Sequence, residues 1–341
     1  MPEGHTVHRL ARTFAELFGG QVLSVSSPQG RFAAGAALLD GARLVDAQAG
    51  GKHLFLGFVP DGGTGPDGGT GPDGAAGAGE PGRWLRVHLG LYGAWTFAGD
   101  GSTAVVHAIG APRRRVGEDE SVGGEPGREI GAAGDGWLPG PPRGAVRVRL
   151  AGEHAVADLT GPTACEVLDP AGKRAVEQRL GPDPLRAGGT DDADVAAFVD
   201  RVRRSRTSVG VQLMDQAVVA GVGNIYRAEA LFRAGLDPLT PGRDVPTEVL
   251  RTLFADLVVL LGEGLRTGRI VTTRPEHRGD DRVAGRHRVR QNTDDDPDAV
   301  PREQSFYVYH REGLPCRVCG TTVLVSDLAG RTLYRCPSCQ V

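Results

Sequence analysis

The chain has 341 residues, of which 40% are hydrophobic and 24% are charged, a composition typical of soluble globular proteins. That length exceeds one small module and predicts two or three folded units. No apolar run approaches the roughly 20 residues that span a bilayer, and residues 1–10 lack the apolar core of a secretion signal. These features exclude a membrane-spanning protein and lead us to expect a cytoplasmic one.

The net charge of −3 does not by itself indicate a nucleic-acid partner, but the charges are unevenly distributed. Arginines gather at 201–206 and again at 311–335, while acidic residues gather at 191–194 and 294–298. Arginines on an ordinary solvated surface would look the same, so these clusters gain meaning only beside other motifs.

The amino-terminal half has the pattern of one helix followed by a β-sandwich. Apolar residues recur with helical spacing over 5–18, and Gly19-Gly20 ends that helix. Short alternating segments separated by turns then predict strands. These segments are 21–26, 43–47, 53–59, 84–89, 94–97, 146–150 and 155–158.

Helical spacing dominates from about residue 173 onward. The predicted helices are 195–204, 209–216, 225–234 and 249–265. Inserts rich in Gly, Pro or charge interrupt the chain at 60–82, 110–144 and 271–302, and we expect them to be mobile and without chemistry. The predicted class is multi-domain α+β. Its predicted domains are a sandwich over 1–170, a helical domain over 171–302 and a small cysteine-bearing module over 303–341.

Four of the five cysteines lie near the carboxyl end and have the spacing of a metal site. Cys316 and Cys319 form one C-x-x-C pair, and Cys336 and Cys339 form another. This spacing suits one tetrahedral Zn²⁺ held by four thiolates, with a hairpin between the pairs. A closed site of this kind is structural and does not react. Four unligated thiols are the alternative.

A glycine turn, Gly221-Val222-Gly223-Asn224, separates two predicted helices. Asn224 can cap the second helix, whose free N–H groups would then suit a phosphate. The arginines nearby suit a polyanion. A glycine turn between helices can equally be only a turn.

The chain begins Met1-Pro2-Glu3, and removal of Met1 would leave a secondary amine on Pro2. An α-amino group titrates near ~8, so part of it is neutral and nucleophilic at physiological pH. Such an amine can attack an aldehyde-like sugar carbon and form an iminium, with Glu3 beside it to move a proton. Without further context, this start is also compatible with an ordinary protein terminus.

Taken together, these motifs resemble the Fpg/Nei family, which comprises formamidopyrimidine glycosylases and endonuclease VIII. The matches follow the family's order along the chain. They are residues 1–9, the catalytic-lysine strand at 51–54, Arg179 with 181–185, the helix–two-turn–helix at 213–226 and the zinc finger at 308–340.

The resemblance implies a bifunctional DNA glycosylase and lyase of base excision repair. Pro2 would attack C1′ of the damaged nucleotide and displace the base, with Glu3 as the acid/base. Lys52 would assist β-elimination and Arg331 δ-elimination, since both cations can neutralise departing phosphates. One structural zinc would hold the finger that aims Arg331. We expect a monomer that binds double-stranded damaged DNA.

Other matched positions would contact the DNA. Asn224 and Arg179 would hold phosphates rather than read sequence. Leu91 and Tyr92 resemble the wedge that the endonuclease VIII branch inserts when a nucleotide is flipped out. Gly90 stands where that branch carries a side chain that enters the duplex. Core side chains in a strand-to-strand turn are the alternative for the wedge.

The start of the chain and the wedge look more like the endonuclease VIII branch, which favours oxidised pyrimidines. A formamidopyrimidine-type enzyme for oxidised purines is the nearest alternative. A non-catalytic damaged-DNA-binding protein is another, although the joint presence of Pro2, Glu3, Lys52 and Arg331 argues against it. A zinc-stabilised interaction module without a nucleic-acid role is the third.

Overall fold

The computed structural model describes residues 2–61, 80–102, 108–110, 137–186, 191–278 and 300–341. Most of each predicted insert therefore lies outside the described residues. The chain forms two compact units. Unit 1 comprises residues 1–2 and 7–177, and unit 2 comprises residues 3–6 and 178–341.

The described residues of unit 1 form nine strands in the order β6-β5-β8-β7-β1-β2-β3-β4-β9. Strand β1 joins two halves, because residues 22–23 pair with β2 and residues 24–26 pair with β7. The strands are β1 (Val22–Ser26), β2 (Ala42–Gly50), β3 (His53–Pro60), β4 (Arg83–His88), β5 (Ala94–Gly99), β6 (Ala108–Gly110), β7 (Val146–Ala151), β8 (Ala155–Thr160) and β9 (Ala164–Leu168).

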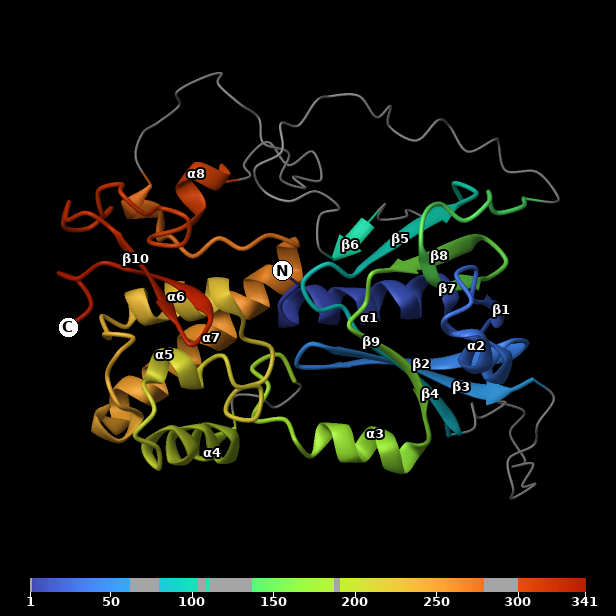
Figure 1. Ribbon diagram of the computed structural model, residues 1–341, viewed down its shortest axis with the longest axis horizontal. Coiled ribbons are helices and arrows are strands. Elements are labelled where there is room, and N and C mark those ends of the chain that lie inside the picture. Colours follow the sequence, from blue (N-terminus) through green and yellow to red (C-terminus); the bar gives the residue numbers. More distant parts are fainter. Residues whose placement is uncertain (1, 62–79, 103–107, 111–136, 187–190, 279–299) are drawn as a thin grey trace. The chain divides into compact units, whose positions relative to one another are not determined.

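Helix α1 (Gly4–Phe18) fills the space between the two halves of the sheet (Figure 1). Its side chains Leu10, Phe14 and Phe18 are fully buried in the core of unit 1. The ring of Phe14 meets Trp95 of β5 edge to face, with the centroids 4.8 Å apart. Because one helix contacts both halves, it supplies the common core that makes the strands a sandwich.

The predicted helix and strands of this half are confirmed, and the structure adds four short elements. They are α2 (Ala33–Leu39), β6, β9 and α3 (Pro170–Glu177). Strand β9 is half-buried or exposed at every position, so it carries none of the alternation that marks a strand in sequence. It exists because it pairs with β4 at the sheet edge.

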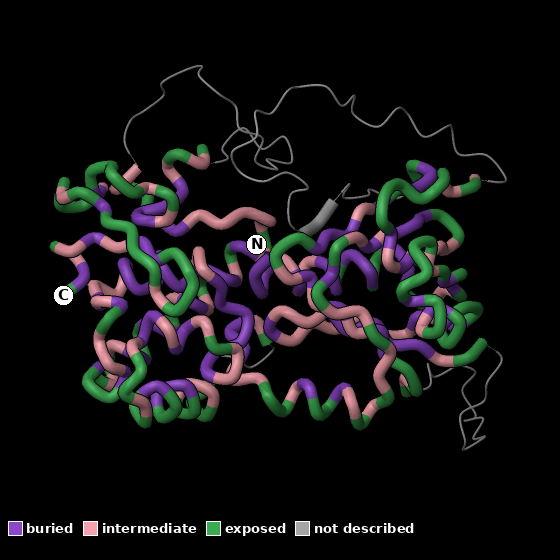
Figure 2. Tube along the Cα trace, in the orientation of Figure 1, coloured by how far each residue is buried: buried purple, intermediate pink, exposed green. Residues whose placement is uncertain are grey.

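The central helix of unit 2 is α6 (Asn224–Arg233), which is buried over residues 226–232 (Figure 2). The other helices are α4 (Asp192–Arg203), α5 (Val209–Gln212), α7 (Thr247–Thr267) and α8 (Arg302–Ser305), with 3-10 turns at Gly242–Asp244 and Pro275–His277. Strands β10 (Leu324–Leu328) and β11 (Arg331–Arg335) form the predicted hairpin. Among the described helices, none is both long and apolar enough to cross a bilayer.

Two expectations for this half are corrected. Helix α5 ends at Gln212 rather than at residue 216, and the Asp215 carboxylate instead accepts the N–H of Ala217 in a turn. The first residues of the predicted insert at 271–302 are packed, because Thr272 is fully buried and its N–H donates to Ser305 at 2.9 Å. Residues 279–299 of that insert lie outside the described residues.

Candidate active site

The carboxylate of Glu3 caps α6. Glu3 is fully buried, and its oxygens accept the N–H groups of Gly223 and Ile225 at 2.8 Å and of Tyr226 at 3.4 Å. These donors lie at the positive end of the helix and lack intrahelical partners, so they stabilise the ionised carboxylate. The expectation that Asn224 caps this helix is wrong, because Asn224 is its first residue and follows the N-cap Gly223.

The backbone at Gly4 lies so close to Gly221 of the glycine turn that there is no room for a side chain on Gly4. The N–H of Gly4 donates to the carbonyl of Gly221 at 2.8 Å, and a Cβ on Gly4 would lie 2.8 Å from the Gly221 Cα. Gly221 has a φ of +85°, a left-handed conformation that favours glycine. Pro2 is buried and joined by a peptide bond to Glu3, so the predicted nucleophile is next to a carboxylate held in place.

Asn224 and Arg227 brace the residue that follows Arg331. Asn224 Nδ2 and Arg227 Nη2 donate to the Thr332 carbonyl at 3.0 and 2.8 Å. Arg227 Nη2 also donates to Asn224 Oδ1 at 2.5 Å. Burial, together with the nearby charge of Arg331, lowers the pKa of Arg227 to about 10, so it remains a cation at neutral pH. Arg331 is exposed at the start of β11, and α6 holds the strand that carries it.

Lys52 lies in the two-residue turn of a β-hairpin. Gly50 of β2 pairs with His53 of β3, which leaves Gly51 and Lys52 as the turn. Gly51 has a φ of +56°, as the favoured two-residue hairpin turns require. Lys52 therefore lies in the turn itself rather than on a strand edge. Its side chain is half-buried.

A histidine that the sequence did not single out lies near Lys52. His88 of β4 stands opposite His53, with the ring centroids 4.9 Å apart. Arg86 Nε lies 3.3 Å from His53 Nδ1, and its Nη1 forms an ion pair with Glu166 at 2.5 Å. Burial, then the charges of Lys52 and Arg86, lower the pKa of His88. The imidazole is therefore held neutral among cations.

The predicted wedge is an exposed turn. Leu91 and Tyr92 are 46% and 64% exposed, so they are not core side chains of a strand-to-strand turn. Gly90 has a φ of +67°, and a Cβ there would lie only 1.7 Å from Thr163 Oγ1. Gly90 is thus required by its left-handed backbone and by the closeness of Thr163. The side chains of Leu91 and Tyr92, which follow it, are exposed.

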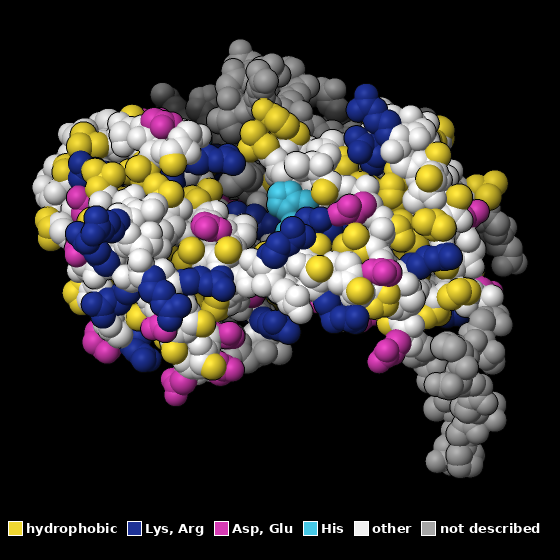
Figure 3. All heavy atoms as spheres, turned by 60° about the horizontal axis from the view of Figure 1, so that its bottom comes forward, with side chains coloured by type: hydrophobic (Ala, Val, Ile, Leu, Met, Phe, Trp, Pro, Cys, Tyr) yellow, Lys and Arg dark blue, Asp and Glu magenta, His cyan; other side chains and the backbone are white. Residues whose placement is uncertain are grey.

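Arg179 is exposed just after α3, in the loop that opens unit 2. That loop is tied to the glycine turn region, since the N–H of Gly181 donates to the Gln216 carbonyl at 2.8 Å. In Figure 3, Lys and Arg side chains gather on the side of unit 2 that faces the viewer. The contact of Arg179 with DNA stays a prediction.

The four cysteines converge on one point in unit 2. Their sulfur atoms all lie within 4.8 Å of one another, with Cys316 and Cys339 at 3.9 Å and Cys319 and Cys336 at 3.5 Å. A tetrahedral Zn²⁺ with bonds of about 2.3 Å places its sulfur ligands about 3.8 Å apart. The cluster therefore has the geometry of a metal-binding site.

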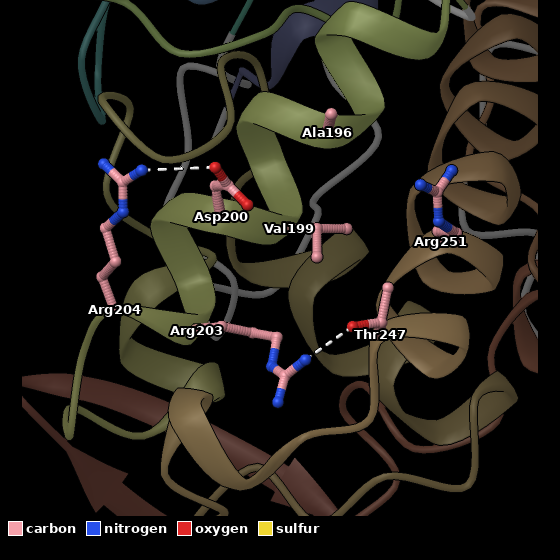
Figure 4. A pocket seen from close by; sticks show the side chains of 7 residues that line it. All are labelled: Ala196, Val199, Asp200, Arg203, Arg204, Thr247 and Arg251. Atoms are coloured by element: carbon pink, nitrogen blue, oxygen red, sulfur yellow. Dashed lines mark hydrogen bonds and ion pairs between the residues drawn. The ribbon is translucent and has the colours of Figure 1, made fainter.

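A pocket between α4 and α7 contains none of the predicted site residues. It has a volume of about 380 Å³ and is lined by Ala196, Val199, Asp200, Arg203, Arg204, Thr247 and Arg251 (Figure 4). Arg203 Nη1 donates to Thr247 Oγ1 at 2.6 Å, and Arg204 pairs with Asp200. The chemistry predicted from the sequence lies elsewhere.

The chain matches two family models. Residues 1–119 match the formamidopyrimidine-DNA glycosylase N-terminal domain, and residues 180–275 match the formamidopyrimidine-DNA glycosylase H2TH domain. A protein named Endonuclease 8 1 from Mycobacterium tuberculosis is 40% identical over 340 residues, which is 100% of both chains. The chain belongs to the Fpg/Nei family. A formamidopyrimidine-DNA glycosylase from Nitratidesulfovibrio vulgaris is 37% identical, but over only 47% of this chain and 38% of its own.

Solved structures of the Fpg/Nei family share the fold. The MutM (Fpg) protein from Thermus thermophilus has a TM-score of 0.63 at 24% identity, covering 99% of this chain and 98% of its own. Lactococcus lactis Fpg in complex with an N7-benzyl-Fapy-dG DNA has a TM-score of 0.67 at 17% identity, with 99% of each chain covered.

As a member of the Fpg/Nei family, the chain is a bifunctional glycosylase and lyase of base excision repair. The family motifs in the sequence carry the predicted catalytic groups, and Arg227 is among the arginines near the glycine turn that were expected to suit a polyanion, but nothing in the sequence points to His88. Arg227 lies three residues after Asn224 on one helix, a spacing that predicts contact between their side chains. His88 had no such signal, because its neighbours come from a paired strand.

Replacing Gly90 tests the geometry of the wedge. Gly90→Ala combines a left-handed φ with a collision against Thr163, so we expect the free energy of unfolding to fall by about 1–3 kcal/mol and excision to slow. Gly101→Ala is the matched control, because Gly101 has a φ of +86° but open space around it. Denaturant unfolding and excision by both variants measure the difference. Equal effects would show that the Thr163 contact is unimportant.

The lowered pKa of His88 predicts a dependence of stability on pH. Below its ordinary value of 6.5, the unfolded chain binds the proton more readily than the folded chain does. The stability contributed by neutral His88 is therefore present above that pH and is lost as the pH falls through the folded value. We expect the stability advantage of the parent over His88→Gln to shrink between about pH 7.5 and about pH 5, measured by thermal unfolding. A constant advantage would contradict the assignment.

Proposed function

We propose that the protein is a monomer that excises oxidised pyrimidines from double-stranded DNA and then cleaves the strand by β,δ-elimination. The observation that carries this proposal is the buried Pro2-Glu3 segment, whose carboxylate is fixed on the amino terminus of α6. The full-length relatives named Endonuclease 8 1 support the pyrimidine assignment. The exposed Leu91 and Tyr92 support it further, since an apolar wedge can fill the gap left by a flipped nucleotide.

In the proposed reaction, removal of Met1 frees the secondary amine of Pro2, and this neutral amine forms a bond to C1′ as the bond from C1′ to the base breaks. The base takes the bonding electrons and a proton. The C1′–O4′ bond then breaks as the nitrogen becomes an iminium, and O4′ takes that electron pair and a proton. Glu3 moves the protons in this step, since its ionised carboxylate can accept one from the attacking amine. Lys52 assists β-elimination, and Arg331 stabilises the phosphate that leaves in δ-elimination.

We further propose that the four-cysteine cluster holds one structural zinc. Its sulfur separations fit that ion, and a thiolate set is the kind that zinc favours. Zinc would fix the ends of the β10–β11 hairpin, while Asn224 and Arg227 hold Thr332 near its turn. Arg179 and Asn224 would hold phosphates of the DNA.

An oxidised-purine preference is the second candidate, and the match of residues 1–119 to a formamidopyrimidine-DNA glycosylase model favours it. The two candidates share the Pro2 chemistry and differ only in the base that enters the site. A comparison of the damaged bases that the protein excises can therefore distinguish the two candidates, whereas a study of the reaction mechanism cannot.

Covalent trapping tests the proposed mechanism. The purified protein is mixed with duplexes that contain one oxidised pyrimidine, one 8-oxoguanine or one ready-made abasic site, and borohydride is added. We expect an adduct that maps to Pro2, formed faster with the pyrimidine than with 8-oxoguanine. Faster trapping on 8-oxoguanine would select the purine candidate. The absence of an adduct even on the abasic site would overturn the lyase mechanism.

Substitution of Glu3 separates its chemical role from its structural one. Glu3→Gln keeps the size of the side chain but removes the ionised carboxylate and leaves one acceptor oxygen where two bind the N–H groups of α6. We expect excision of intact bases to fall by at least about a hundredfold. Excision at the parent rate would refute the acid/base role. Circular dichroism checks that the variant is folded.

The proposed zinc makes Cys319 essential in a way that Cys165 is not. Cys319→Ser should reduce bound zinc, measured by atomic emission, and should suppress δ-elimination because Arg331 loses its support. Cys165→Ser is the control, since Cys165 lies in β9 of unit 1 and is not one of the four clustered cysteines. Full zinc content and δ-elimination in Cys319→Ser would contradict the assignment.

A further inference from the structure

The buried rings of His5 and Tyr226 contact each other near Glu3. His5 lies in the first turn of α1 and is 5% exposed, while Tyr226 lies in the first turn of α6 and is fully buried. Their ring centroids are 5.5 Å apart and their planes cross at 84°, an edge-to-face contact. The Thr6 hydroxyl lies 3.2 Å from His5 Nε2. Residues 3–6 thus contact α6 through the ring of His5 as well as through the carboxylate of Glu3.

Tyr226 belongs to both the ring contact and the Glu3 cap. Its N–H is one of the donors to the Glu3 carboxylate, at 3.4 Å. Among the described residues its hydroxyl has no hydrogen-bond partner, although it is buried. Burial and the charge of Glu3 raise the pKa of Tyr226 well above its ordinary value, so the phenol stays neutral. Burying an unpaired hydroxyl is unfavourable, and the packing of the ring must offset that cost.

A glycine in α7 makes room for the two rings. A Cβ on Gly264 would lie 2.3 Å from the Tyr226 hydroxyl and 3.0 Å from His5 Cγ. Glycine inside a helix is less favourable than alanine, so a buried one usually has a packing reason. Here the missing side chain lets the phenol and the imidazole both reach the surface of α7.

The segment that follows Pro2 is therefore held by contacts at three successive residues. Glu3 is held by α6, Gly4 by the carbonyl of Gly221, and His5 by Tyr226. A chain terminus has one covalent neighbour, so its position depends on such contacts more than that of an internal residue. Misplacement of a reacting atom by about 1 Å can cost a hundredfold in rate.

We infer that His5 and Tyr226 form an aromatic latch, seated on Gly264, that positions Pro2 and Glu3 for base excision. The inference rests on the proposed function of that same segment. His5 and Gly264 are positioning residues and take no part in proton transfer. The proposed role of His5 is carried by the contact of its ring with Tyr226.

Two glycines of α7 provide a matched test. Gly264→Ala pushes a methyl group into the latch, whereas Gly262→Ala adds the same group where nothing lies within 4 Å. Single-turnover excision gives the chemical rate, and binding to a duplex with an uncleavable abasic analogue gives Kd. We expect Gly264→Ala to lose at least about tenfold in rate with Kd within about twofold of the parent, and Gly262→Ala to match the parent in both.

Substitutions of His5 show whether the ring is the active feature. His5→Ala should slow excision as Gly264→Ala does, and His5→Phe should recover most of that loss with an unchanged pH profile. Thermal unfolding reports the folded fraction of every variant. A purely structural role predicts that the rate falls and the apparent Kd rises in step with the loss of folded protein, and that outcome would overturn the latch. A Gly264→Ala variant that excises at the parent rate, or a His5→Phe variant as slow as His5→Ala, would overturn it too.

The parent protein separates this inference from the proposed function in the same assay. If the parent forms no adduct at Pro2, the proposed function fails. If the parent forms the adduct and Gly264→Ala excises at the parent rate, the latch alone fails.

Discussion

One buried carboxylate at the start of one helix completes the fold of unit 2 and is also the group proposed to move protons. Helix α6 is buried over residues 226–232, so its first N–H groups cannot rely on water. Glu3 accepts three of them. A buried polar group left without a partner costs about 1–3 kcal/mol, so removing the amino terminus from this position is strongly unfavourable. The residue proposed to move protons is therefore also the one that completes the helix.

The two cations proposed for the elimination steps both lie at hairpins, Lys52 within a turn and Arg331 at the first strand residue after one. Lys52 follows Gly51 in the β2–β3 turn, and Arg331 follows Ala329 and Gly330, whose φ angles of +52° and +72° form the β10–β11 turn. Short turns of this kind leave little backbone freedom, and paired strands on both sides hold their ends. Arg227 adds a brace from α6 to the second hairpin.

Patterns confined to a short stretch of chain predicted the structure well. The helical spacing of 5–18 and 249–265 produced α1 and α7, and the two C-x-x-C pairs converge as their spacing indicated. Predictions failed where a distant partner decides. Residues 271–278 look like a polar loop, yet Thr272 is buried because Glu229 and Ser305 satisfy its hydroxyl and its N–H.

The sequence by itself determined the class of fold, the cysteine cluster, the family resemblance and the identity of the predicted catalytic groups. Only the tertiary structure decided that Glu3 rather than Asn224 caps α6, that Gly90 is imposed by Thr163, and that Gly264 makes room for His5. The physical reason is separation along the chain. Glu3 and Gly223 are 220 residues apart, and no local spacing encodes a hydrogen bond that forms only when both elements are packed.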